Sequence, residues 1–97
     1  MDLSKVEEQI IIIILLLMYY LYILKCGDDS FYTGITNDVE KRLTSHREGK
    51  GSKYVRSHLP FELIYQEKYK TKEKACKREF EIKHWPRQKK LTLINKS

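Results

Sequence analysis

The sequence has few of the residues that cross-link small domains. Only two of its 97 residues are cysteines, Cys26 and Cys76, and neither has the Cys-x-x-Cys or Cys-His spacing that is typical of zinc sites. Two cysteines cannot form a framework of several disulfides, so this usage favours reduced thiols and a cytoplasmic protein. Glycine and proline are also scarce, at four and two residues, which excludes collagen-like and low-complexity chains.

The sequence also lacks an apolar run long enough to span a membrane. Apolar residues continue from Ile10 to Leu24, about fifteen residues, whereas a spanning helix needs roughly twenty. Three acids and one lysine precede this run, and a secretory signal would need a positive leader and a small-residue cleavage site. We therefore expect residues 10–18 to be buried or to mediate self-association, and a membrane anchor to be the less favoured alternative.

A change in composition near Met18 divides the chain into an N-terminal extension, residues 1–17, and one domain, residues 18–97. An alternative that stays open is that Met18 begins the ancestral domain and that residues 1–17 were added upstream. The first 24 residues have a net charge of −2, so the overall charge of +6 leaves +8 on the remainder. A basic domain of this kind is expected to bind a polyanion.

The pattern of residues predicts a β-hairpin followed by a helix. Residues 19–26 and 31–35 are rich in aromatic and aliphatic side chains, and the turn residues 27–30 separate them. Thr36, Asn37 and Asp38 each offer a cap, Glu40 lies three residues after Asn37 as in a capping box, and Gly49 supplies a stop. We expect a helix over residues 38–48.

The second half of the domain predicts one more strand and two more helices. A basic loop is expected over residues 49–60, a strand over 61–69, a helix capped by Thr71 over 71–84, and a short helix that Pro86 begins. The predicted order is β-β-α-β-α-α. The fold class is therefore α+β, a small three-stranded antiparallel sheet flanked by helices, with an apolar N-terminal extension.

Two helices place polar groups on their apolar faces. On a helical wheel Glu79 lies between Ala75 and Cys76, where a carboxylate is costly unless it is paired or binds a cation. An ion pair with a nearby Lys or Arg is the simpler alternative. In the first long helix Arg42 and His46 are four residues apart, so that both could reach one phosphate, unless they form a solvated flank.

Several residues in order resemble the GIY-YIG nuclease superfamily, and its small stand-alone branch most closely. They are the segments Tyr20-Leu21-Tyr22 and Tyr32-Thr33-Gly34, then Arg42 and His46, and finally Glu79. The resemblance extends over about residues 18–93. It implies a divalent-metal-dependent endonuclease that acts on DNA, with structure rather than sequence selectivity, in DNA repair or recombination.

The resemblance also implies a role for each matching residue. Glu79 would hold one Mg²⁺ or Mn²⁺ ion, and no small-molecule cofactor would be needed. Tyr22 and Tyr32 would line the site, and one of them would deprotonate or orient the attacking water. We predict that both tyrosines face the same side of the sheet as Glu79 and Arg42, which depends on the hairpin register. Arg42 would stabilise the pentacovalent phosphate, and His46 would assist proton transfer or positioning.

The sequence departs from the family pattern at several positions. Tyr20 and Leu21 stand where the first motif has Gly and Ile, and Thr33 stands at the central Ile of the second motif, whereas Gly34 is retained where a side chain would crowd the site. An Asn that many members have after the metal-binding Glu is matched by Asn95, by Gln88 or by neither.

The loop after the first long helix is expected to contact nucleic acid. Its candidate residues are three cations and one aromatic ring, Lys50, Lys53, Arg56 and Tyr54, which suit backbone phosphates and one stacked base. A mobile, solubilising loop is the alternative. For the whole chain, the rival to a nuclease is a non-catalytic nucleic-acid-binding module, and a third class is an interaction protein that docks through its leader.

Overall fold

The protein is described by a computed structural model over residues 3–96. Three antiparallel strands form one sheet in the order β2-β1-β3. The elements along the chain are α1 (Leu3–Leu17), β1 (Tyr19–Cys26), β2 (Phe31–Thr36), α2 (Val39–Arg47), α3 (Lys53–Ser57), β3 (Phe61–Tyr69), α4 (Lys72–Lys83) and α5 (Arg87–Lys96). The predicted α+β class and the order β-β-α-β-α-α are confirmed, with α1 and α3 in addition.

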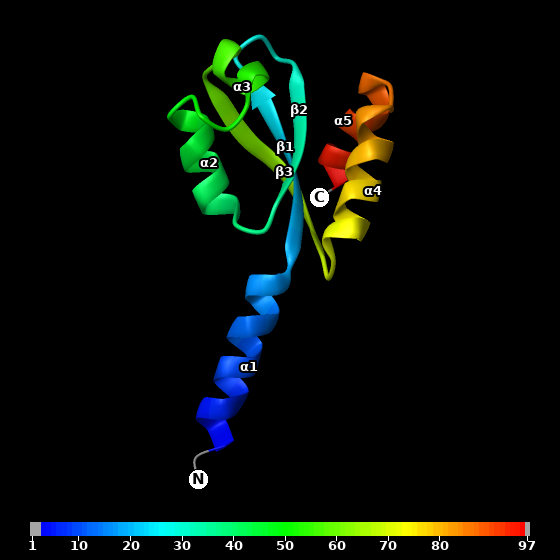
Figure 1. Cartoon of the computed structure of the whole chain (residues 1–97). Coiled ribbons are helices and arrows are strands. Elements are labelled where there is room, and N and C mark those ends of the chain that lie inside the picture. Colours follow the sequence, from blue (N-terminus) through cyan, green and yellow to red (C-terminus); the bar gives the residue numbers. More distant parts are fainter. Residues whose placement is uncertain (1–2, 97) are drawn as a thin grey trace.

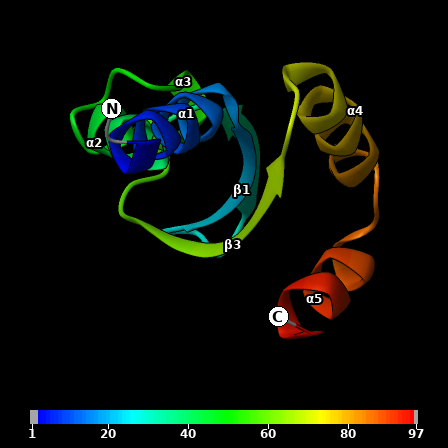
Figure 2. The same ribbon diagram turned by 90° about the horizontal axis from the view of Figure 1, so that it is seen from below.

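The sheet lies between two helical layers, so the domain has two apolar cores. Helices α2 and α3 cover one face and α4 and α5 cover the other, as Figures 1 and 2 show. The core beneath α2 and α3 contains the buried residues Tyr22, Leu24, Leu43 and Val55. The core beneath α4 and α5 contains Leu21, Ile23 and Ile82. Alternate residues of β1 therefore point into different cores, as the two-residue period of a strand requires.

The hairpin register determines what each face of the sheet presents. Tyr22 of β1 pairs with Gly34 of β2, and Leu24 pairs with Tyr32, all on the face that α2 covers. Strand β1 also pairs with β3, with a bulge at Ile23 and Leu24. Because β1 is central, both β2 and β3 are edge strands.

Helix capping follows the predicted chemistry, with one correction. Thr71 caps α4 as predicted, because its side chain accepts a hydrogen bond from the Lys74 amide at 3.2 Å. The cap of α2 is Asp38 rather than Asn37, since the Asp38 carboxylate accepts from the Lys41 amide at 3.1 Å. Both residue types favour this position, and the backbone selects the later one.

The segment predicted as a loop over residues 49–60 contains the short helix α3. The Ser52 side chain caps this helix by accepting from the amides of Tyr54 and Val55. Val55 is completely buried in the core beneath α2 and α3 and anchors the segment. Gly49 ends α2 with a φ of 76°, a conformation that glycine adopts without strain.

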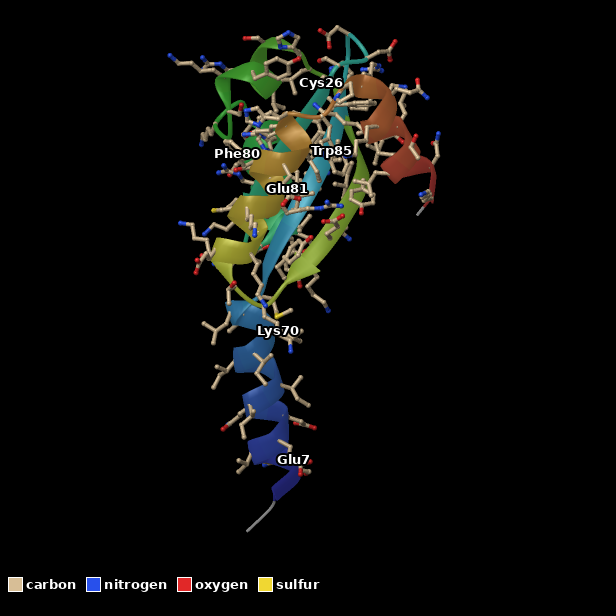
Figure 3. All side chains as sticks on the ribbon, turned by 90° about the vertical axis from the view of Figure 1, so that its right-hand side faces the viewer. Glu7, Cys26, Lys70, Phe80, Glu81 and Trp85 are labelled. Carbon is tan, nitrogen blue, oxygen red and sulfur yellow. The ribbon has the colours of Figure 1, made fainter. Side chains whose placement is uncertain are left out.

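Helix α1 extends away from the domain and leaves its apolar side chains exposed (Figure 3). The eight residues from Ile10 to Leu17 are between 48% and 68% exposed. The alternative that this segment is buried within the chain is therefore wrong, and self-association remains a prediction. Among residues 3–96, none of the helices combines the length and the apolar character that crossing a membrane requires.

Candidate active site

Two tyrosines and a histidine lie together beneath α2. As predicted, Tyr22 and Tyr32 point to the same face of the sheet, with ring centroids 6.2 Å apart. The His46 ring packs edge-on against both, at centroid distances of 5.9 and 5.5 Å. Tyr22 is completely buried, whereas Tyr32 is partly exposed at the sheet edge. Tyr32 is thus the tyrosine of this pair that a substrate can touch.

The Tyr22 hydroxyl is held between His46 and Arg42. It lies 2.8 Å from His46 Nε2, and Arg42 Nε donates to its oxygen at 3.4 Å. Two glycines permit this packing. A Cβ on Gly34 would lie 2.5 Å from the Tyr22 hydroxyl oxygen, and a Cβ on Gly51 would lie 2.5 Å from His46 Nδ1. The buried contact between Tyr22 and His46 therefore requires glycine at both positions.

The protonation states of Tyr22 and His46 follow from their burial and from these hydrogen bonds. Burial is the main cause that raises the pKa of Tyr22 to about 12, with Tyr32 adding to the effect and Arg42 opposing it. Burial, and then the charge of Arg42, lower the pKa of His46, so the imidazole is neutral near pH 7. A neutral imidazole has one acceptor nitrogen, so Nε2 can accept a hydrogen bond from the Tyr22 hydroxyl.

In that arrangement His46 carries its own proton on Nδ1. This nitrogen is buried and has no hydrogen-bond partner within residues 3–96. A buried polar atom without a partner destabilises a fold by about 1–3 kcal/mol. Such a group is expected at a site where function constrains the residue.

Arg42 is the cation that the site offers to an anion. Its guanidinium is partly buried, and its hydrogen bond with Tyr22 is the largest of the causes that raise its pKa. Within the part of the chain that the structure describes, no carboxylate forms an ion pair with it. Arg42 also lines a hollow of about 200 Å³ together with Lys41 and the carboxylate of Asp38. A phosphate there would meet two cations and one anionic side chain, and Arg42 is the cation that a hydrogen bond to Tyr22 holds in place.

The structure corrects the expectation that Arg42 and His46 reach one phosphate together. Only 1% of His46 is exposed, and its ring lies in the core against Tyr22. Its i, i+4 spacing from Arg42 places both on the inner side of α2, but the imidazole lies deeper. His46 therefore acts on a substrate only through Tyr22.

Glu79 lies on α4, which covers the opposite face of the sheet from the tyrosines. The expectation that it shares their face is wrong. Its side chain is 23% exposed and forms an ion pair with Lys83 at 3.5 Å, the simpler alternative from the sequence. The next residue, Phe80, is 66% exposed, so the apolar side of α4 is narrower than its wheel suggests. Glu79 and Arg42 are thus on helices that cover opposite faces of the sheet.

The carboxylates of the domain are suited to a sparsely ligated ion. Among residues 3–96 there is no group of three or more His, Cys, Asp or Glu side chains that could form a protein cage for a metal. Mg²⁺ commonly keeps several waters and binds one or two carboxylates together with substrate phosphates. One partly exposed carboxylate, that of Glu79, fits this binding mode if Lys83 releases it. Gln88 and Asn95 are both exposed on α5.

The predicted nucleic-acid contacts lie on and before α3. Lys50, Lys53, Tyr54 and Arg56 are all exposed, and Lys50 forms an ion pair with Glu48 at 3.6 Å. Tyr54 is fixed more firmly, because its hydroxyl donates to the Ser30 hydroxyl at 2.6 Å and its ring stacks on His58. This segment is therefore ordered by its own contacts.

Sequence reasoning missed a polar network on the other face of the sheet. Arg78 donates two hydrogen bonds to the Glu67 carboxylate, at 2.9 and 3.1 Å, and the hydroxyls of Tyr65 and Tyr69 donate to it as well. Burial favours a higher pKa for Glu67, but these hydrogen bonds together hold it below its ordinary value. The alternation of Tyr65, Glu67 and Tyr69 along one strand was the available signal. The network attaches α4, and with it Glu79, to β3.

Comparisons with known proteins agree with this architecture. The model of the GIY-YIG catalytic domain matches residues 18–92. A UPF0213 protein of Staphylococcus saprophyticus is 53% identical over 76 residues, covering 78% of this chain and 93% of the relative. One of Staphylococcus epidermidis is 52% identical over 75 residues, covering 77% and 92%.

Two solved structures are also similar. The solution NMR structure of a UPF0213 protein from Bacillus halodurans has 45% identity and a TM-score of 0.54, covering 80% of this chain and 83% of that one. The solution NMR structure of a protein from E. faecalis has 38% identity and a TM-score of 0.59, covering 81% and 84%. Residues 1–17, and with them the whole of α1, lie outside the segment that the family model matches.

Proposed function

Because the chain belongs to the GIY-YIG family, a nuclease family, we propose that it is a divalent-metal-dependent endonuclease that hydrolyses phosphodiester bonds in DNA. The observation that carries the proposal is the state of Arg42. This guanidinium is partly buried, has no carboxylate partner among residues 3–96, and is oriented by the hydroxyl of Tyr22. An anionic phosphate supplies the charge that the site lacks.

Phosphodiester hydrolysis needs a base for water and positive charge at the phosphate. Tyr32 is the tyrosine that faces solvent, so it is placed to orient the attacking water, and in its phenolate form it would accept the proton of that water. Arg42 then stabilises the negative charge that develops on the phosphate oxygens. Both side chains lie at the β2 edge of the sheet, where a DNA backbone can reach them.

Tyr22 and His46 support these two residues from within the core. The Tyr22 oxygen accepts a hydrogen bond from Arg42 and orients it, and the Tyr22 hydroxyl donates a hydrogen bond to the neutral His46 ring at 2.8 Å. Tyr22 and His46 are positioning residues, since neither is exposed to substrate.

Glu79 is the residue that would hold the metal. A bound Mg²⁺ or Mn²⁺ supplies further charge neutralisation at the phosphate and acidifies the water that it coordinates. Lys83, which pairs with Glu79 in the structure, would then be free to contact the DNA backbone.

Selectivity is proposed to depend on DNA structure rather than on sequence, as in repair or recombination. The basic residues Lys50, Lys53 and Arg56 suit phosphates, which carry no sequence information.

One observation favours a second function, a non-catalytic nucleic-acid-binding module. Glu79 already forms an ion pair with Lys83, and the described residues contain no group of three or more His, Cys, Asp or Glu side chains that could hold a metal ion. In that case the basic surface and the fold would serve binding alone.

The two functions are separated by Glu79→Gln, with Glu81→Gln on the same helix as the matched control. We expect the wild type and Glu81→Gln to cleave branched, nicked or linear DNA with Mg²⁺ or Mn²⁺. Glu79→Gln should lose cleavage at least a hundredfold while retaining DNA binding, and it should lose binding of Mn²⁺ measured by electron paramagnetic resonance. Absence of cleavage by the wild type with either metal on every substrate would reject the nuclease and leave the binding module.

A further inference from the structure

A groove on the edge of β2 combines aromatic rings and lysines. It has a volume of about 360 Å³ and is lined by Phe31, Tyr32, Thr33, Tyr54, Lys83 and Lys90. These residues come from β2, α3, α4 and α5, so the groove joins the two faces of the sheet at its open edge. No acidic residue lines it. The groove shares Tyr32 with the proposed active site and Lys83 with the Glu79 ion pair.

Tyr54 is the exposed ring of this groove, and it is held in place from several directions. Its ring lies nearly parallel to that of Tyr32, with centroids 6.2 Å apart and planes inclined by 20°. On His58 it stacks at 4.1 Å with planes inclined by 13°. The Tyr54 hydroxyl donates to Ser30, and its carbonyl lies 2.6 Å from His58 Nδ1. An aromatic side chain that is 40% exposed is thus fixed before any ligand binds.

A ring held in this way contributes little to the fold through burial. Tyr54 and Tyr32 instead present aromatic surface to a hollow that two lysines also line. Aromatic platforms beside cations are what single-stranded nucleic acids bind, because their bases stack on the rings while their phosphates meet the cations. In a duplex the faces of the bases are already stacked on one another, so a platform of this kind has nothing to bind there.

We propose that this groove binds an unpaired nucleotide, with its base stacked on Tyr54 and its flanking phosphates near Lys83 and Lys90. This inference rests on the proposed function and names the substrate class of the same site, a DNA strand with an unpaired segment next to the bond that is cut. Lys90 is available for this role, since no carboxylate pairs with it within residues 3–96. The shared residue Tyr32 places the unpaired base directly beside the attacked phosphate.

The test measures binding without divalent metal, so that cleavage cannot interfere. Fluorescence anisotropy with a labelled single strand and with a hairpin duplex of the same length compares the full-length wild type with Tyr54→Leu and Tyr54→Phe. Loss of the stacking ring in Tyr54→Leu should weaken single-strand binding about ten- to a hundredfold and leave duplex binding unchanged. Tyr54→Phe keeps the ring and should retain single-strand binding, which controls for loss of the hydroxyl.

A second readout detects stacking directly. A strand containing 2-aminopurine should lose fluorescence on binding the wild type and Tyr54→Phe, but not on binding Tyr54→Leu. Lys90→Gln should weaken binding and reduce the slope of log affinity against log salt by about one, as expected for one lost phosphate contact. Thermal unfolding of each variant shows whether the fold is retained.

The outcomes separate this proposal from the nuclease itself. Equal losses of single-strand and duplex binding in Tyr54→Leu, or no loss of either, would overturn the groove proposal even if Glu79→Gln abolishes cleavage. Conversely, selective loss of single-strand binding in a protein that cleaves nothing would support the groove and reject the nuclease.

Discussion

The buried hydroxyl of Tyr22 provides the sharpest prediction, because Tyr22→Phe removes one oxygen and leaves the ring. The ring stays in the core beneath α2, so the fold should persist. The change removes the 2.8 Å bond to His46 Nε2 and the 3.4 Å contact from Arg42. Since His46 Nδ1 has no partner within the described residues, the imidazole would be left with neither nitrogen bonded.

Tyr22→Phe is expected to change both the stability of the fold and the rate of cleavage. Leaving a buried polar group without its partner should lower the free energy of unfolding by about 1–3 kcal/mol. Loss of the oxygen that orients Arg42 should slow cleavage by about a hundredfold or more, the range seen when one group that stabilises transition-state charge is lost. Urea unfolding followed by the fluorescence of Trp85, the single tryptophan, and single-turnover cleavage would measure the two effects.

Tyr65→Phe is the matched control on the opposite face of the sheet. Tyr65 also has a pKa raised to about 12, primarily by burial, and its hydroxyl donates to the Glu67 carboxylate. This variant should lose a similar amount of stability, about 1–3 kcal/mol, and retain cleavage. Undiminished cleavage by Tyr22→Phe, or an equal loss in Tyr65→Phe, would refute the role of the buried pair in catalysis.

Three further predictions concern stability and assembly. Glu67→Gln should lower the free energy of unfolding by about 2–3 kcal/mol, because it breaks the mostly buried ion pair with Arg78. As a control, Glu48→Gln in the exposed ion pair with Lys50 should change the free energy of unfolding by less than about 1 kcal/mol. Because the pKa of Glu67 is lower in the folded protein than in the unfolded chain, its stabilisation should be complete above about pH 4.3 and fall as the pH drops toward the folded pKa. Urea midpoints measured against pH should show an acid limb that is reduced in Glu67→Gln, and an unchanged limb would contradict this account. Gly34→Ala should lower the free energy of unfolding by about 1–3 kcal/mol and reduce cleavage, because the new Cβ would lie 2.5 Å from the Tyr22 hydroxyl oxygen. Wild-type behaviour in both assays would show that the close approach of Gly34 to Tyr22 is unimportant. The full chain should sediment as an oligomer and a chain beginning at Met18 as a monomer. The reason is that the apolar side chains of α1 are exposed, and a second copy of this helix can cover them. Identical sedimentation of the two chains would contradict a role of α1 in assembly.

Local chemistry in the sequence was sufficient for most of the elements. The turn residues between the hairpin strands, the alternation over residues 61–69 and the Thr71 cap each act over a few residues, and all were located correctly. Helix α3 was missed because five residues span little more than one turn and give no helical period. Asn37 and Asp38 are both good caps, so their order could be decided only by the backbone.

The candidate site depended more on tertiary structure. The ordered motif residues were enough to suggest the family, and the family model matches residues 18–92. A helical wheel, however, gives only the inner side of a helix and not the face of the sheet that the helix covers. For that reason the sequence could not show that α2 with Arg42 and α4 with Glu79 lie on opposite faces of the sheet.

The tertiary structure likewise decided how deeply each side chain of α2 lies in the core. Arg42 and His46 have equivalent places in the helical pattern, yet one is partly exposed and the other is buried against Tyr22. This difference arises from the pairing of Tyr22 with Gly34 and from the approach of Gly51, contacts between residues far apart in the chain. The sequence determined which chemical groups the protein has and the elements that bear them, whereas packing across the sheet determined which groups meet, because side-chain contacts depend on distances that no local pattern encodes.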